Sequence, residues 1–159
     1  MNTHCLIPLI ATIAYIPLFA ILISNRPWQR QRRLFVWFLI AAILWSLSDF
    51  LLRSDFFMPH KLLLSKIVVC IFTLAAAQFH CFISLFYPQN KGRWLPLAYS
   101  SVAIAVALAV LGYIPEGIVI ADGVLYIRHG NGVFLMGLPL AVVTVRNIYF
   151  FAAKNQDFR

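Results

Sequence analysis

The sequence predicts an all-α integral membrane protein: a bundle of five transmembrane helices with a small extracytoplasmic β-hairpin between the fourth helix and the fifth. Two observations support the membrane assignment. Of the 159 residues, 62% are hydrophobic and 11% are charged, whereas soluble domains carry about 25% charged residues. The apolar residues also gather in five runs, each close to the ~20 residues that a helix needs to cross a bilayer. We therefore expect a single membrane domain, residues 1–159, surrounded by lipid.

The five apolar runs set the bounds of the predicted helices. These helices cover about residues 5–24, 34–53, 61–87, 94–114 and 133–153. Prolines occur inside the first, fourth and fifth runs. Membrane helices tolerate proline because neighbouring helices satisfy the backbone groups that it leaves free. Each run is therefore expected to form one crossing.

The link between the fourth and fifth helices has the pattern of a hairpin. Its segment "GIVIADGVLYI" consists of two runs rich in β-branched residues on either side of Asp122-Gly123. Asp-Gly between such runs favours a type I′ turn, because both central positions of that turn need positive φ. We predict a β-hairpin over about residues 117–128, on the outer face of the membrane.

The Lys and Arg residues indicate how the helices are oriented. With the N-terminus outside, nine of the thirteen fall on cytoplasmic faces, among them the four arginines of the first link. The other four, Arg53, Lys61, Lys66 and Arg128, fall outside. Positive residues accumulate on the cytoplasmic side of membrane proteins, so we expect an outer N-terminus and a cytoplasmic C-terminus. This bias accounts for the net charge of +8 without a nucleic-acid partner.

Polar residues near the outer end of the second helix form the first candidate site. Asp49 can pair with Arg53 at i+4, and Trp45 precedes it at i−4 on the same face. Ionisable side chains in a membrane often mark functional sites. One interpretation is a ligand-binding pocket near the outer surface, rimmed also by Asp122 of the hairpin. The alternative is a helix end whose charges reach the headgroups, with Trp45 as a packing residue.

Two further candidate ligand-binding residues, Gln78 and His80, lie inside the third apolar run. Their side chains would contact a ligand or carry protons, or they would form interhelical hydrogen bonds that fix the packing. Both interpretations stay open. Arg146, in the fifth run, is expected to extend its side chain to the inner face.

The sequence lacks the motifs of an enzyme. It contains no Gly-rich phosphate loop, no paired carboxylates on one helix and no nucleophile with a base at a recognisable spacing. No spacing typical of metal ligands occurs, and we interpret Cys70 and Cys81 as buried packing residues. We therefore expect neither catalytic activity nor a cofactor.

The second and third runs resemble a known family. "FLIAAILWSLSDFLLRSDF" and "KLLLSKIVVCIFTLAAAQFHCFISLFYP" are similar to the N-terminal seven-transmembrane sensor region of bacterial histidine kinases. The residues that carry the likeness are Trp45, Ser46, Leu47 and Asp49, followed by Phe79, His80, Phe82, Phe86, Tyr87 and Pro88. The resemblance implies a multi-pass protein of the bacterial cytoplasmic (inner) membrane. It also implies a sensory input domain of a two-component-type signalling protein. The chain ends where the family's sixth helix would begin, so we expect a fragment that lacks the output kinase.

Two functions are consistent with these features. As a sensory input domain, the chain would bind a small hydrophobic or amphipathic ligand between its helices near the outer leaflet. Its partners would be the lipid bilayer and either a second copy of the chain or a downstream kinase domain. The alternative is a small membrane scaffold or transporter subunit without a sensing role, in which Gln78, His80 and Arg146 mark helix contacts or a conduction path.

Overall fold

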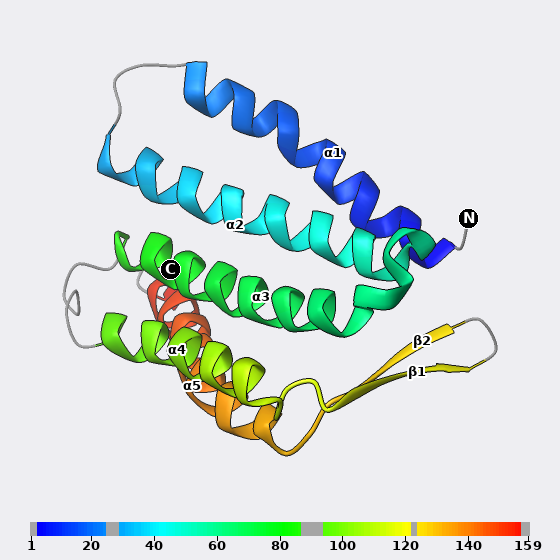
Figure 1. Cartoon of the computed structure of the whole chain (residues 1–159). Coiled ribbons are helices and arrows are strands. Elements are labelled where there is room, and N and C mark those ends of the chain that lie inside the picture. The colour runs from blue at the N-terminus through cyan, green and yellow to red at the C-terminus, as the bar shows by residue number, and fades with distance from the viewer. Residues whose placement is uncertain (1–2, 25–28, 87–93, 122–123, 157–159) are drawn as a thin grey trace.

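The computed structural model describes residues 3–24, 29–86, 94–121 and 124–156. Five α-helices and one pair of strands make up this part of the chain (Figure 1). The helices are α1 (Thr3–Ser24), α2 (Arg30–Arg53), α3 (Lys61–Ser84), α4 (Leu95–Leu111) and α5 (Gly132–Gln156), and the 3₁₀ helix η1 (Asp55–His60) links α2 to α3. The antiparallel strands β1 (Gly117–Ala121) and β2 (Val124–Arg128) lie between α4 and α5. The predicted all-α fold with a hairpin at this position is confirmed.

Among the described residues, four helices are long and apolar enough to cross a membrane. These candidate spans are Leu6–Ser24, Arg30–Arg53, Lys61–Ile83 and Gly132–Tyr149. The remaining helix, α4, has 17 residues. At 1.5 Å per residue it is about 25 Å long, against a hydrocarbon core of about 30 Å. Length and composition thus support a multi-pass membrane protein with one short helix.

α4 ends earlier than we predicted because Gly112 closes it. Gly112 has a φ of 82°, the left-handed conformation that glycine adopts without a steric penalty. The N–H of Gly112 donates to the carbonyl of Ala109 at 3.3 Å, and the N–H of Tyr113 donates to that of Leu108 at 2.9 Å. These two bonds are typical of a glycine-closed helix end. The predicted bound at residue 114 is therefore wrong, and Leu111 is the last helical residue.

Several other helix bounds also differ from the prediction. α1 begins at Thr3, before the predicted residue 5, and α5 ends at Gln156, beyond the predicted residue 153. α2 begins at Arg30, about one turn before the predicted residue 34, because arginine and glutamine are good helix formers and continue the helix beyond its apolar part. α3 ends at Ser84, before the predicted residue 87. Hydropathy marks where the chain is apolar, whereas the helix end depends on local backbone bonding.

The helices pack mainly on their neighbours in sequence. Figure 1 shows α1, α2, α3 and α4 side by side in chain order, and α5 packs against both α4 and α3. α3 is the central helix because it contacts α2, α4 and α5. α1 lies at the edge on α2, and its other face exposes isoleucines such as Ile10 and Ile13. In a membrane this apolar face would lie against lipid.

Aromatic side chains hold α3 against α2. The ring centroids are 5.0 Å apart for Phe35 and Phe82, 5.3 Å for Phe38 and Phe79, and 5.4 Å for Trp45 and Phe72. Aromatic pairs at such distances are favourable beyond the area they bury. From the first pair to the third, the residue number increases in α2 and decreases in α3. The two helices are therefore antiparallel, and the ring pairs fix their register.

Small side chains hold α3 against α4 and α5. Ala77 of α3, Ala98 of α4 and Val143 of α5 meet in one buried cluster. Further along, Ala105 of α4 is buried in a second cluster with Met136 of α5. Small residues let helix axes approach closely, which favours helix association in lipid, where burial of apolar surface gives no advantage.

β1 and β2 pair in antiparallel fashion as the two strands of the hairpin. The register pairs Gly117 with Arg128 at the open end and Ala121 with Val124 beside the turn. The pairing thus reaches the residues on either side of Asp122-Gly123. These two residues lie outside the described ones, so the type I′ turn stays a prediction.

The backbone after β2 passes close to the residue before β1, and the two strands point away from the helices (Figure 1). A Cβ at Gly130 would overlap the side chain of Glu116 unless that side chain moved, so glycine lets this carboxylate lie close to the backbone where the chain leaves β2. The strands project beyond the helices at the end of the bundle that also holds η1 (Figure 1), and we call this end the hairpin end. Val119 and Tyr126 pair across the strands and are 55% and 56% exposed.

The first prediction concerns the small-residue contact between α3, α4 and α5. Ala105 is completely buried, so Ala105→Leu should overpack the contact and destabilise the protein by about 1–3 kcal/mol. Thermal melting of the detergent-purified protein, followed by circular dichroism, measures the effect. Ala103→Leu adds the same side chain on the exposed face of α4 and should leave the melting temperature unchanged. Equal melting temperatures for both variants would contradict the packing described.

Candidate functional site

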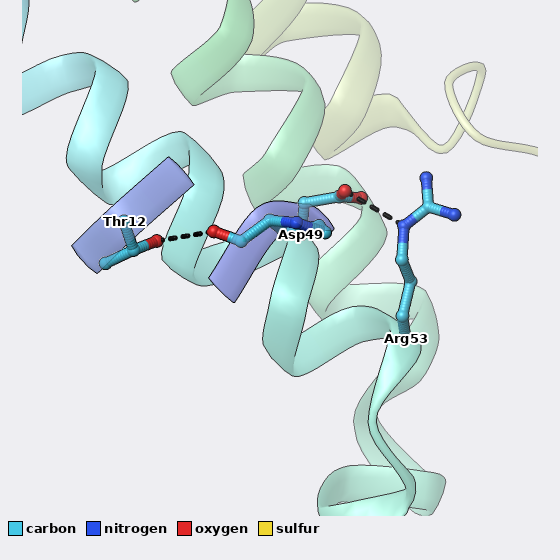
Figure 2. Close-up of polar contacts among 4 residues, drawn as sticks. Thr12, Asp49 and Arg53 are labelled. Carbon is cyan, nitrogen blue, oxygen red and sulfur yellow. Dashed lines mark hydrogen bonds and ion pairs between the residues drawn. The ribbon is translucent and has the colours of Figure 1, made fainter. Parts of the chain in front are cut away.

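Asp49 and Arg53, at the hairpin end of α2, form the ion pair that the sequence predicts. Arg53 Nε donates to Asp49 Oδ2 at 2.9 Å (Figure 2), and the two side chains are 43% and 18% exposed. Figure 2 also draws Thr12 of α1, whose hydroxyl donates to the carbonyl of Pro8 at 2.9 Å. The polar groups drawn there are thus bonded within their own helices.

The ring contact of Trp45 is with α3, not with Asp49. Its ring packs on Phe72 of α3 with the centroids 5.4 Å apart, as part of the aromatic contact between α2 and α3. This arrangement matches the alternative in which Trp45 is a packing residue. Asp122, the proposed rim residue of the hairpin, lies outside the described residues.

Gln78 and His80 contact different neighbours of α3. Gln78 Nε2 donates to the hydroxyl of Tyr99 in α4 at 3.1 Å. His80 Nδ1 lies 3.0 Å from Asn147 Oδ1 in α5, a separation that suits donation from a protonated Nδ1 to the amide oxygen. Both His80 and Asn147 are buried, at 2% and 9% exposure. The hydrogen-bonding alternative for these two residues therefore describes what the structure contains.

The structure does not bring the predicted site residues together. The ring pair of Trp45 and Phe72 places Asp49 level with about position 68 of α3. His80 lies twelve positions further along α3, which is about 18 Å at 1.5 Å per residue. The candidates thus divide into an ion pair at the hairpin end and a second group near the opposite end of the bundle.

The second group is larger than the sequence predicted, and we call it the polar cluster. It comprises Gln78, His80, Cys81, Trp94, Tyr99, Arg146 and Asn147. Cys81 Sγ lies 3.6 Å from the Tyr99 hydroxyl, and Arg146 Cζ lies 4.7 Å from the centroid of the Trp94 ring. A guanidinium at this distance over an indole is attracted by the ring electrons. The cluster therefore joins α3, α4 and α5 through polar contacts within apolar helices.

The sequence analysis did not predict Asn147 as a site residue. It is polar and lies inside an apolar run, which is the same signal that singled out His80. Tyr99 carried a weaker signal, because tyrosine is common near the ends of membrane helices as an interfacial residue.

An open groove adjoins the polar cluster. It runs along α5 beside the start of α4 and has a volume of about 1490 Å³. Apolar side chains such as Leu97, Leu138 and Val142 line most of its length, whereas Trp94 and Arg146 lie at the end away from the hairpin. The groove therefore has the two-part character of an amphipathic ligand, with a long apolar body and a cation at one end.

The polar cluster does not resemble a metal centre. Within the described ranges, no three His, Cys, Asp or Glu side chains lie close enough together to hold a metal ion. His80 and Cys81 are adjacent in sequence but reach Asn147 and Tyr99, respectively. The chemistry that this arrangement supports is binding through charge, hydrogen bonds and apolar contact.

Comparison with known proteins gives no relative from which a role could be inferred. No family model matches the chain, and no curated protein or solved structure matches it significantly. The likeness to the sensor region of histidine kinases therefore stays a prediction, and the function has to be argued from the site.

The second prediction concerns the His80–Asn147 contact. Asn147→Leu should cost about 1 kcal/mol, because it leaves a buried ring nitrogen without its acceptor. Adding His80→Leu should restore much of this loss, because replacing both partners with apolar groups is close to neutral. Titration of the folded protein with dodecyl sulfate measures the stability.

A matched control is available one turn away on α5. Thr144→Val removes a hydroxyl that donates to Leu140 of the same helix, so it should change the stability little. If the single and double variants of His80 and Asn147 lose stability additively, the two side chains do not interact.

Proposed function

We propose that this chain is the membrane-embedded sensory input domain of a two-component-type signalling protein. The observation that carries the proposal is the buried contact of His80 with Asn147, which ties α5 to α3. Arg146, one residue away, lies at the end of the groove between α4 and α5. A ligand in the groove would therefore act next to the contact that positions α5. The likeness of residues 38–56 and 61–88 to bacterial sensor regions supports the same function.

The His80–Asn147 contact suits a switch because it depends on the relative position of two helices. Hydrogen bonds weaken steeply with distance and angle, and helices in signalling proteins shift by about 1–2 Å. A ligand changes the balance between two helix positions only if it binds one of them more tightly. A ligand that contacts both α4 and α5 would meet this condition when its contacts fit one position of α5 better than the other. The Asp49–Arg53 pair does not, because it lies within one rigid helix.

We also propose five crossings of the bacterial cytoplasmic membrane, with the N-terminus outside. α4 shares its buried face with α3 and α5, which supports the same depth for all three helices despite its length of 17 residues. Trp94 before α4 and Tyr113 after it suit the two interfaces. The bias of Lys and Arg sets the orientation. The hairpin end then faces outward, and the polar cluster lies near the inner leaflet.

The third prediction tests this topology by cysteine labelling in a variant whose three native cysteines are replaced by alanine. Asn131→Cys lies after β2, and Gln29→Cys precedes α2; both positions are exposed. A membrane-impermeant maleimide should label Asn131→Cys in intact cells and Gln29→Cys only after the membrane is opened. The reverse pattern would overturn the orientation. Labelling of both from outside would overturn the proposed crossings.

The fourth prediction tests the sensory role directly. The whole chain is fused through α5 to the cytoplasmic part of a histidine kinase, and phosphorylation of the partner regulator is measured in membranes. Asn147→Leu should change the phosphorylation level by at least about threefold, since a loss of about 1 kcal/mol is roughly a fivefold shift between two states. Thr144→Val should leave the level unchanged.

The amount of fusion protein in the membrane is measured in parallel, so that a loss of protein is not taken for a loss of signal. Equal phosphorylation per molecule in all fusions would mean that α5 passes no signal. The chain would then fit the alternative of a scaffold or transporter subunit.

A further inference from the structure

One face of α5 stays exposed beside the groove. Gly137, Ala141, Val145 and Tyr149 recur at every fourth position of this helix, and all four line the groove. Residues four apart lie on the same face of a helix, so we call these four residues the α5 row. Val145 and Tyr149 are 65% and 68% exposed. The α5 row is therefore an apolar strip that the contacts with α3 and α4 leave uncovered.

Gly137 leaves open space in the middle of this strip. A Cβ built at Gly137 would have no neighbouring side chain, and no backbone beyond its own turn of helix, within 4 Å. Packing within the described part of the chain therefore does not require a glycine here, although glycine weakens a helix relative to alanine. Small residues on a membrane helix let a second helix approach closely, whereas lipid gains nothing from them. The space at Gly137 thus suits a helix from outside the described fold.

A second copy of the chain brings the same strip to the same depth of the bilayer. Two copies inserted in one orientation are related by a twofold axis along the membrane normal, so residues near the axis meet their own counterparts. The two α5 rows would then face each other, with Gly137 and Ala141 at the closest approach. Helices that pack along rows of every fourth residue cross at about −40° to −50°. The α5 row has the spacing that this crossing needs.

The exposed side chains along the groove are large enough for such a contact. Phe134 and Leu138 also line the groove and are 74% and 70% exposed. An aromatic side chain offers about 150–250 Å² of surface, so Phe134 and Tyr149 together leave roughly 200–350 Å² uncovered. With the aliphatic residues of the groove and the same surface on the second copy, the contact buries on the order of 1,000 Å², which is the size that a specific interface needs.

Arg146 lies on a different face of α5 from the row. It follows Val145 by one residue, which is about 100° around the helix, and its guanidinium lies 4.7 Å from the centroid of the Trp94 ring. A contact along the α5 row therefore does not set the two Arg146 side chains of a dimer against each other. The row itself carries no charge that the contact would have to desolvate.

We infer that α5 docks on α5 of a second copy of the chain, with the two α5 rows in contact across a twofold axis. This inference deepens the proposed function by naming the partner of the groove, and it rests on that function for the meaning of the contact. In the proposed sensor α5 is the helix that carries the signal, so a small ligand would act by shifting this pair of helices. The contact itself is tested without the kinase fusion.

The fifth prediction uses cysteine cross-linking in the variant whose three native cysteines are replaced by alanine. Ala141→Cys places a thiol in the α5 row, and Ala103→Cys places one on the exposed face of α4. Each purified protein is reconstituted into phosphatidylcholine vesicles at a low ratio of protein to lipid, and copper phenanthroline oxidises neighbouring thiols to a disulfide. Ala141→Cys should form at least about fivefold more covalent dimer than Ala103→Cys, because a disulfide forms only where two thiols meet closely.

Variants of Gly137 distinguish a helix contact from a face that lipid covers. Gly137→Leu, combined with Ala141→Cys, should reduce the covalent dimer at least about fivefold, because it fills the space where the helices meet. Ala103→Leu adds the same side chain outside the α5 row and should leave the amount of dimer unchanged. Helix content and elution volume confirm that each variant is folded, and the comparison of Ala141→Cys with Ala103→Cys stands by itself if Gly137→Leu does not fold.

Gly137→Ala gives opposite effects on the fold and on the contact. In dilute detergent, where the chain is monomeric, it should raise the melting temperature, because the added methyl group meets no neighbouring segment and alanine favours a helix. In vesicles it should lower the amount of Ala141→Cys dimer, because the helices can no longer approach as closely.

Three outcomes would overturn the inference. Equal cross-linking of Ala141→Cys and Ala103→Cys would show that lipid covers the groove. Strong cross-linking of Ala141→Cys that Gly137→Leu leaves unchanged would show that the copies meet through another surface. A lower melting temperature for Gly137→Ala would show that the fold itself needs the glycine. None of these measurements reports phosphorylation in the kinase fusion, so the docking of α5 and the proposed function fail separately.

Discussion

The packing of the other helices depends on how α3 is oriented about its own axis, because this orientation decides which neighbour each face of α3 meets. One face presents Phe72, Phe79 and Phe82 to the aromatic residues of α2, and another presents Ala77 and His80 to α4 and α5. Each face suits only one kind of neighbour, because bulky rings would hold apart helices that small residues bring together. Once the rings are docked on α2, the direction of every polar side chain on α3 is set.

Much of the fold follows from features that are local in the sequence. A crossing helix needs a long apolar run, and such runs are readily seen. The hairpin could be predicted because Asp-Gly between β-branched runs specifies its own turn. The Asp49–Arg53 pair was equally accessible, since i,i+4 residues are neighbours on any helix. The end of α4 was readable in principle, because Gly112 with a proline shortly after it is a common way to end a helix.

The candidate site could not be predicted in the same way, because it depends on contacts between segments far apart in the chain. His80 and Asn147 are separated by 67 positions. In a soluble helix a polar stripe shows which face is turned outward, whereas lipid accepts apolar side chains on every side. The sequence therefore gives little sign of helix rotation, and it did not show that Gln78 would meet α4 while His80 meets α5. The groove beside Arg146 depends on this rotation too.

The shortness of α4 has a consequence for the bilayer itself. A helix of 17 residues is about 5 Å shorter than the hydrocarbon core that surrounds its longer neighbours. A bilayer adapts to such a mismatch by thinning locally, at a cost of a fraction of a kcal/mol for each ångström. The thinned patch would lie beside α4, where it would draw the headgroups toward Trp94. Membranes of different thickness would therefore meet this part of the protein under different strain, even when their lipids carry the same charge.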